Sequence, residues 1–521
     1  MNPLLLLGLG LSIVLGGILW LRLHPFLSLI LGAFAVGGLT STDYIQKSMA
    51  AKYEGDAFRK QVTKRVKEKI TELKSDNQTF IETTIRTEAR KELKLRQSEF
   101  KDAADKKAAD YAKQNTLKRI TGAFGTTCGK IGILIAMACV IGRCMLASGA
   151  AERIVRGALS LFGAKAVPTA FCGSAFLLGI PVFFDSLFLL AIPLVKATWL
   201  KVKKNYVLFV VALVAGGTMT HSLVPPTPGP LFVAEELGVN LGTMILTGMA
   251  VGVCCSATGL LYAHWINKRM DVPLRETPEA MKKLEELSKR DVSELPSLGL
   301  SLLPILLPVA LISGVTIYMS GLDPTETIHP IVGMLGDKNI ALTIAAALAM
   351  MMAGARLKNR QAVADHVQQA MLEGGLIILI CCAGGAFGAM LQQSGIGPYI
   401  SGMTGSEPLN FGLLPLAFVI TAVIRGAQGS ATVAMFTGVA IVGSLVTDLG
   451  DLSYHPVYLA VAIGCGSKPF PWMNDSGFWV ISKMSGMTEK ETLMALTPMA
   501  TIMGLTGIIV TMIAAKIFPM V

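Results

Sequence analysis

Apolar runs long enough to cross a lipid bilayer recur along the whole chain, and they constrain the fold more than any other feature. The chain has 521 residues, of which 52% are hydrophobic and 16% charged, whereas soluble domains carry about 25% charged residues. About 20 apolar residues in a helix span the hydrocarbon core. The sequence therefore predicts an all-α polytopic membrane protein with single spans near 3–22, 24–41, 126–147, 205–222, 239–266, 298–320, 339–355, 370–393, 455–472 and 494–518.

Two further apolar runs, 166–198 and 411–446, are too long for one simple helix. "GIPVFFDS" (179–186) interrupts the first run and "RGAQGSAT" (425–432) interrupts the second. Backbone that leaves a helix at membrane depth must be buried in protein or line a cavity, because lipid offers it no hydrogen bonds. We therefore expect roughly 10–14 membrane segments, among them interrupted helices or re-entrant hairpins.

The two halves of the membrane region resemble one another at an offset of 246 residues. "IGRCMLASGAAERI" (141–154) aligns with "FGAMLQQSGIGPYI" (387–400), and the same offset superposes the two interruptions. "HSLVPPTPGPLFV" (221–233) and "SKPFPWMNDSGFWV" (467–480) form a third pair. Paired, interrupted segments are the sequence mark of a secondary transporter site. We expect inverted repeats, although the inversion depends on whether 166–198 crosses the membrane or re-enters it.

Charge and hydropathy divide the chain into six parts. These are a transmembrane hairpin, a charged helical insertion, a first repeat, a charged loop, linking transmembrane helices and a second repeat, at 1–44, 45–119, 120–266, 267–297, 298–369 and 370–521 respectively. The insertion holds 20 of the 46 Lys and Arg residues. Because acidic residues interleave with them, we expect a solvated helix surface near anionic lipid headgroups and no nucleic-acid partner.

The insertion carries apolar residues at helical spacing. A first stripe and a second one, separated by "SDN" at 75–77, comprise Phe58, Val62, Val66, Ile70 and Leu73, then Ile81, Ile85, Ala89 and Leu93. Two helices folded back as a coiled-coil hairpin would bury both stripes. A single long helix that pairs with another subunit is the alternative.

Four breaks in the membrane segments gather polar residues. A carboxylate at the bilayer centre costs at least ~2.5 kcal/mol, so Asp185 requires a partner or a role. Helix ends exposed at such breaks favour bound ions. The candidates are Asp185 and Ser186 in the first break, Thr220, His221, Ser222 and Thr227 in the second, Arg425, Gln428, Ser430 and Thr432 in the third, and Lys468, Asn474, Asp475 and Ser476 in the fourth.

These residue types suit a polyhydroxylated carboxylate. Arg425 and Lys468 are candidates for its charge, and the hydroxyl and amide side chains are candidates for its OH groups. Asp185 is the first candidate for proton coupling, with His221 and Asp475 as further candidates. All nine cysteines lie in or beside apolar segments without metal-ligand spacing, so we expect no metal and no cofactor.

Structural interpretations remain open for the charged residues. Asp185 could form a buried ion pair with a cation of another break. Asp475 could cap a helix without touching a ligand, and His221 could be an interior residue whose hydrogen bonds are satisfied. Arg143 lies in an apolar span without a hydroxyl cluster around it, and we expect it in a structural ion pair.

Several motifs resemble the gluconate permease family, the gluconate:proton symporters of the ion transporter superfamily. They are "GIPVFFDSLFLLAIPL" (179–194), "GAFGAMLQQSGIG" (385–397), "GSATVA" (429–434) and "NDSGFW" (474–479) followed by "MTEKETL" (487–493). The resemblance covers about 120–521 and the first two helices. It implies proton-coupled uptake of a sugar acid across the bacterial inner membrane, an inverted-repeat fold, and a transport domain that moves against a homodimeric scaffold. The insertion and "SKPFPW" (467–472) depart from the family's pattern.

The sequence thus predicts a secondary active transporter that imports a gluconate-like anion by proton symport through alternating access. A sodium-coupled carboxylate or D-serine transporter of the same fold is the alternative. A membrane scaffold acting through the 45–119 coiled coil is the alternative of another class. The motifs of an intramembrane enzyme, such as GxSxG or HExxH, are absent from the sequence.

Overall fold

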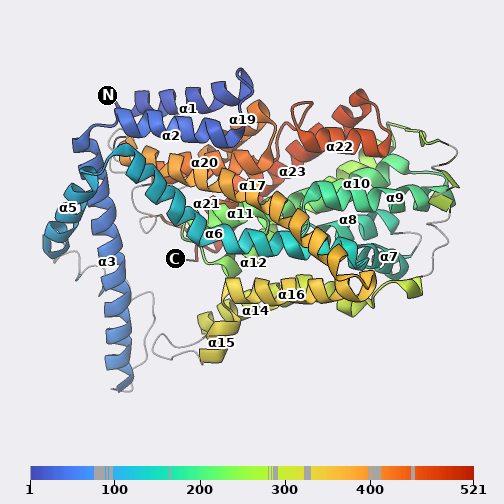
Figure 1. Cartoon of the computed structure of the whole chain (residues 1–521), viewed down its shortest axis with the longest axis horizontal. Helices are drawn as coiled ribbons and strands as arrows, with labels where there is room; N and C mark the ends of the chain where they lie inside the picture. The colour runs from blue at the N-terminus through green and yellow to red at the C-terminus, as the bar shows by residue number, and fades with distance from the viewer. Residues whose placement is uncertain are drawn as a thin grey trace.

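Helices make up the regular structure throughout the described part of the chain (Figure 1). A computed structural model describes residues 2–75, 88–89, 92, 98–163, 166–277, 279, 281–282, 284–285, 292–321, 330–396, 399, 412–446 and 452–520. Within these ranges, seven helices are long and apolar enough to cross a membrane, or eight if a bent pair is counted as one span. The prediction of an all-α polytopic membrane protein is confirmed.

The predicted single spans coincide with individual helices. They are α1 (Pro3–Leu19), α2 (Pro25–Leu39), α6 (Thr116–Ala147), α10 (Tyr206–Leu223), α12 (Leu241–Asn267), α14 (Leu298–Gly321), α16 (Lys338–Leu357), α17 (Arg360–Gln393), α21 (Pro456–Gly466) and α23 (Glu489–Ile517). Shorter elements are α7 (Ala150–Phe162), η1 (Val292–Glu294) and α15 (Pro330–Leu335). Exposed apolar side chains such as Leu261 and Ile509 lie on the outer faces of the spans, as expected for surfaces that contact lipid.

Both overlong runs are pairs of shorter helices, as their polar interruptions predict. The first run contains α8 (Val167–Leu178) and α9 (Phe184–Val202), and the second contains α19 (Leu413–Gln428) and α20 (Ala431–Leu445).

Two further helices are broken by irregular backbone. After residues 224–227, α10 continues as α11 (Pro228–Glu236), and after residues 467–475, α21 continues as α22 (Ser476–Ser485). The predicted span 455–472 is therefore too long. Its helix ends at Gly466 because Pro469 and Pro471 have no N–H to donate to a preceding turn.

Helix boundaries recur at the offset seen in the sequence. Gly149 follows α6 and Gly395 follows α17, and both have positive φ, +79° and +77°. Glycine adopts this left-handed conformation without steric cost, which lets the chain turn sharply after each helix. The starts of α8 and α19, Val167 and Leu413, are also 246 residues apart. The order of elements is thus repeated, while the inversion of the repeats and the six-part division of the chain stay predictions.

The insertion folds back on itself at one end of the molecule (Figure 1). Its helices α3 (Thr42–Ser75) and α5 (Ser98–Ala112) pack side by side. Ile45 and Met49 of α3 form a small core with Ala108 and Ala112 of α5. Farther along α3, Arg65 pairs with Glu92 at 3.2 Å. The proposed turn at 76–77 and the apolar positions 81, 85 and 93 lie outside the described residues.

Polar contacts fasten the base of the insertion to the C-terminal end of α17. Lys52 Nζ donates a hydrogen bond of 2.9 Å to Gln392. The side chain of Gln393 accepts from Arg119 at 2.7 Å and donates to the hydroxyl of Tyr111 at 2.8 Å. The hairpin is therefore attached to the second half of the chain, although it is inserted in the first.

Candidate functional site

An ion pair between α19 and α22 lies at the centre of the candidate site. Arg425, in the last turn of α19, pairs through Nη2 with a carboxylate oxygen of Asp475. The two side chains are only 6% and 14% exposed. The other oxygen of Asp475 accepts a hydrogen bond of 2.9 Å from the N–H of Gly477 and so caps α22. Asp475 thus caps a helix, as one interpretation had it, and at the same time holds Arg425.

Asp185 lies beside this ion pair, in the first turn of α9. A Cβ added to Gly477 would stand 3.7 Å from a carboxylate oxygen of Asp185 and 3.4 Å from one of Asp475. The two oxygens therefore lie within about 7 Å of each other. Among the described residues, the carboxylate of Asp185 makes no hydrogen bond and no ion pair. In this arrangement Arg425 is bonded to Asp475, and the carboxylate of Asp185 is left without a cation.

Lys468 and Asn474 hold the fourth break against the second and third. The ammonium of Lys468, a residue only 6% exposed, donates a hydrogen bond of 2.6 Å to the carbonyl oxygen of Thr218 near the end of α10. The amide of Asn474 donates to the carbonyl oxygens of Gly426 at 2.9 Å and Ala427 at 3.2 Å. Three breaks are thus joined by side chains that bond to backbone carbonyls.

The remaining candidates fall into three groups. Three hydroxyls bond to backbone groups of their own segments, those of Thr220, Thr227 and Ser430. Three more residues lie in the first turns of α9, α20 and α22, namely Ser186, Thr432 and Ser476. Buried polar atoms without a hydrogen-bond partner among the described residues occur in His221, Ser222, Arg425, Gln428 and Asn474.

These unpaired atoms distinguish the breaks from the rest of the interior. An unsatisfied buried polar group costs about 1–3 kcal/mol, and native interiors contain few of them. Arg425 alone leaves Nε and Nη1 unpaired. His221 leaves Nδ1 unpaired, and its ring packs edge-on against Phe183 of the first break with 6.1 Å between ring centres. Their concentration at the breaks indicates a place where a polar ligand would be stabilised.

Sequence reasoning missed three residues that shape this site. Gly429 lies at the third break with a φ of +84°, and an added Cβ would stand 2.1 Å from the carbonyl oxygen of Asn474. Gly477 lies between the two carboxylates. Trp472 donates from its indole N–H to the carbonyl oxygen of Gly426 at 2.8 Å. The signal for the two glycines was their place inside the polar interruptions, and no local signal marked Trp472.

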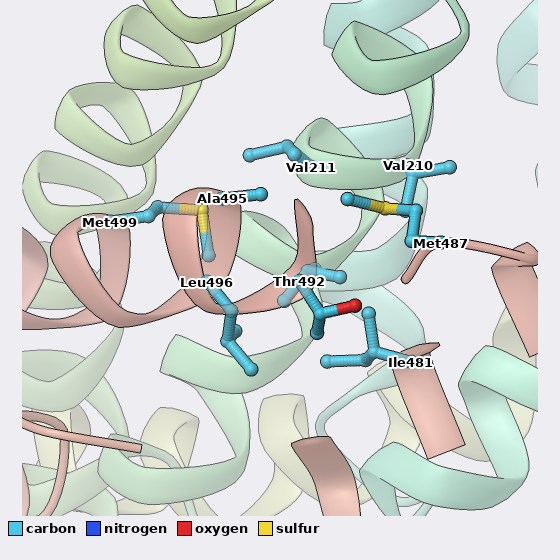
Figure 2. Close-up of a pocket in the computed structure, with 9 residues that line it drawn as sticks. Val210, Val211, Ile481, Met487, Thr492, Ala495, Leu496 and Met499 are labelled. Atoms are coloured by element: carbon cyan, nitrogen blue, oxygen red, sulfur yellow. The ribbon is translucent and has the colours of Figure 1, made fainter. Parts of the chain in front are cut away.

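A separate small cavity lies between α10, α22 and α23 (Figure 2). It has a volume of about 10 Å³, and its lining is apolar apart from Thr492. The hydroxyl of Thr492 is bonded to the carbonyl oxygen of Thr488 at 2.9 Å. Side chains such as Val211, Leu496 and Met499, which Figure 2 labels, offer no partner for a carboxylate. This cavity is not the site formed by the breaks.

Comparison with known proteins decides the family. Residues 108–517 match the family described as GntP family permease. The chain belongs to the GntP permease family. An uncharacterized permease of Haemophilus influenzae is 34% identical to this GntP permease over 75% of the chain and 82% of its own length. The inner membrane permease YgbN of Escherichia coli is 32% identical (76% and 87% covered), and a gluconate permease of Pseudomonas aeruginosa is 31% identical (76% and 87% covered).

Solved structures agree with this GntP permease in fold. The YdaH transporter of Alcanivorax borkumensis superposes with a TM-score of 0.55 at 14% identity, covering 77% of this chain and 89% of its own. MtrF of Neisseria gonorrhoeae gives a TM-score of 0.54 at 16% identity, with 76% and 84% covered. The GntP permease is therefore a multi-pass inner membrane transporter and not an enzyme, and the resemblance found in its sequence motifs is confirmed.

Proposed function

We propose that this GntP permease imports a gluconate-like sugar acid together with a proton by alternating access. The observation that carries the proposal is a buried arginine, Arg425, with two unpaired donors. Arginine presents its donors in a planar fork that matches a carboxylate. The relative from Pseudomonas aeruginosa is named gluconate permease, which supports the same substrate class for this chain.

The groups around Arg425 suit the rest of such a molecule. A sugar acid carries several hydroxyl groups, each of which donates and accepts hydrogen bonds. Gln428 has an amide with both ends unpaired, and Ser222 has an unpaired hydroxyl. The binding of a polyhydroxylated anion would therefore satisfy atoms that are otherwise buried without partners.

Asp185 is the proposed proton carrier. Asp475 is engaged by Arg425 and by the start of α22, so its charge is part of the structure of the site. Asp185 has no such partner in the described residues, and a carboxylate in the membrane interior without a cation is costly unless it takes up a proton. The carboxylates thus have different proposed roles: Asp475 orients Arg425, and Asp185 binds and releases the coupling proton.

Alternating access follows from the burial of the unpaired atoms. The donors of Arg425 and the amide of Gln428 are shielded from solvent. A substrate can therefore reach them only when the breaks separate on one side of the membrane. The GntP permease in this arrangement has the breaks closed around the site, and transport requires a second arrangement.

Uptake into proteoliposomes tests this function. Purified wild type and Asp185→Asn are given radiolabelled gluconate with an inward proton gradient. Wild type is expected to concentrate gluconate and Asp185→Asn only to equilibrate it. Asp365→Asn, which removes an exposed carboxylate on α17, is expected to behave as wild type. Concentration by Asp185→Asn would refute the coupling role, and uptake by wild type that requires a sodium gradient would refute proton symport.

A further inference from the structure

A short segment of the charged loop ties the two halves of the permease together at the end of the molecule opposite the insertion. We call residues 271–277 the strap. Val272 within it is 1% exposed, which anchors the segment to the body. Two neighbouring residues of opposite charge, Arg275 and Glu276, form its main contacts. The strap reaches one element in each half of the chain.

Arg275 binds the turn between α22 and α23 in the second half. Its two terminal nitrogens bond to the carboxylate of Glu491 at 2.7 and 2.8 Å, and Nη1 also donates to the carbonyl oxygen of Gly486 at 2.7 Å. The backbone of the strap packs closely there, since a Cβ on Gly486 would stand 3.4 Å from the carbonyl oxygen of Arg275. The hydrogen bonds to Glu491 raise the pKa of the Arg275 guanidinium, so its charge is permanent.

Glu276 binds α9 in the first half. Its carboxylate pairs with the ammonium of Lys196. The Lys196 side chain is only 10% exposed and that of Glu276 only 18%. Removal of one partner from a buried pair leaves an uncompensated charge and is strongly destabilising. The pair is therefore a firm link between the strap and α9.

The strap holds both helices at the same distance from the candidate site. Lys196 follows Asp185 by 11 residues, and Gly486 follows Asp475 by 11 residues, which is about 16 Å of helix in each case at 1.5 Å per residue. α9 and α22 also pack against each other along their length. The pair of helices is thus fixed at one end by the strap and meets around Gly477 at the other.

We propose that the strap fixes the register of α9 against α22 and so keeps Asp185 beside Asp475 during transport. Arg275 and Glu276 are positioning residues, since they touch neither carboxylate. A slip of one helix turn would move Asp185 by about 5.4 Å relative to Asp475 and separate the proton carrier from the residue that orients Arg425. This inference rests on the coupling role proposed for Asp185.

Hydrogen exchange measured by mass spectrometry tests the strap without any substrate. Glu276→Gln in the full-length purified protein is expected to raise exchange about 5-fold or more in the first turns of α9 and α22, a change typical of coupling between distant sites. The exchanged pair Lys196→Glu with Glu276→Lys is expected to restore protection. Glu235→Gln, which breaks the Lys338–Glu235 pair at the other end of the molecule, is the matched control and is expected to leave both turns protected.

Transport by the same variants separates positioning from binding. In proteoliposomes, Glu276→Gln is expected to lower the gluconate accumulation ratio while the KM for gluconate stays near that of wild type. Unchanged exchange in both turns, in Glu276→Gln and in Arg275→Lys, would overturn the inference, as would equal loosening by Glu235→Gln or a failure of the exchanged pair to restore protection. If wild type does not concentrate gluconate, the proposed function fails, and hydrogen exchange still decides the role of the strap.

Discussion

Gly429 makes the closest approach between the third and fourth breaks, and its replacement by alanine gives a sharp prediction. Two separate costs follow. A left-handed φ of +84° in a residue with a Cβ costs about 1–3 kcal/mol. The new Cβ would also stand 2.1 Å from the carbonyl oxygen of Asn474, so the two breaks must move apart by about 1 Å to restore van der Waals contact.

A second glycine separates these costs. Gly238 has a φ of +62°, and a Cβ added to it would meet nothing within 4 Å. Gly238→Ala therefore pays the backbone cost alone, and we expect a lower melting temperature in detergent with near-normal gluconate uptake. For Gly429→Ala we expect a similar loss of stability and a fall of about 100-fold in uptake rate, because displacement of interacting groups by 1 Å has such effects on catalytic sites.

Initial rates in proteoliposomes, normalised to the amount of folded protein, are the measurement. The reasoning requires that the two variants differ in transport far more than in melting temperature. If Gly429→Ala transports as fast as Gly238→Ala, the third and fourth breaks are not pressed together in the states that bind substrate. The contacts of Asn474 with the third break would then have no bearing on transport.

Two further predictions concern the scaffold. The Lys-rich turn after α9 lies at the opposite end of the molecule from α3 and α5 (Figure 1), and basic loops face the cytoplasm; the insertion is therefore external, and a membrane-impermeant maleimide is expected to label Lys60→Cys in intact cells and Lys204→Cys only in lysed cells. Labelling with the opposite pattern would reverse the topology. The Arg143–Glu373 pair joins α6 to α17, so Glu373→Gln is expected to cost about 3 kcal/mol by leaving a charge unpaired, as read from thermal unfolding, whereas joint replacement of both residues by methionine is expected to recover most of that loss.

Local signals in the sequence were sufficient to predict the helices and their interruptions. Apolar length marks each span, and a polar or glycine-rich stretch inside an overlong run marks each break. The offset of 246 residues recurs in the structure at Gly149 and Gly395, because a turn after a helix needs a glycine in both halves. The one misplaced boundary, in the span predicted at 455–472, shows that proline overrides hydropathy.

The pairing of charges was beyond the sequence. Arg143 was expected in an ion pair, but its partner Glu373 lies 230 residues away and only the packing of α6 on α17 selects it. Asp475 is held by Arg425, 50 residues earlier, rather than by the nearer Lys468. Contacts of this kind depend on which helix faces meet, and helical periodicity alone does not encode that.

The docking of α1 and α2 has a consequence for how the protein can be shortened. Similarity to the family begins at residue 108, after both helices and nearly all of the insertion. Yet Gly10 and Gly32 lie so close to Phe387 of α17 that an added Cβ would stand 3.2 and 3.1 Å from its ring. A protein trimmed to the matched residues would expose Phe387 and its neighbours to lipid or to another chain. The limit of recognisable homology therefore falls inside one packed unit, and a truncation placed there would remove part of its core.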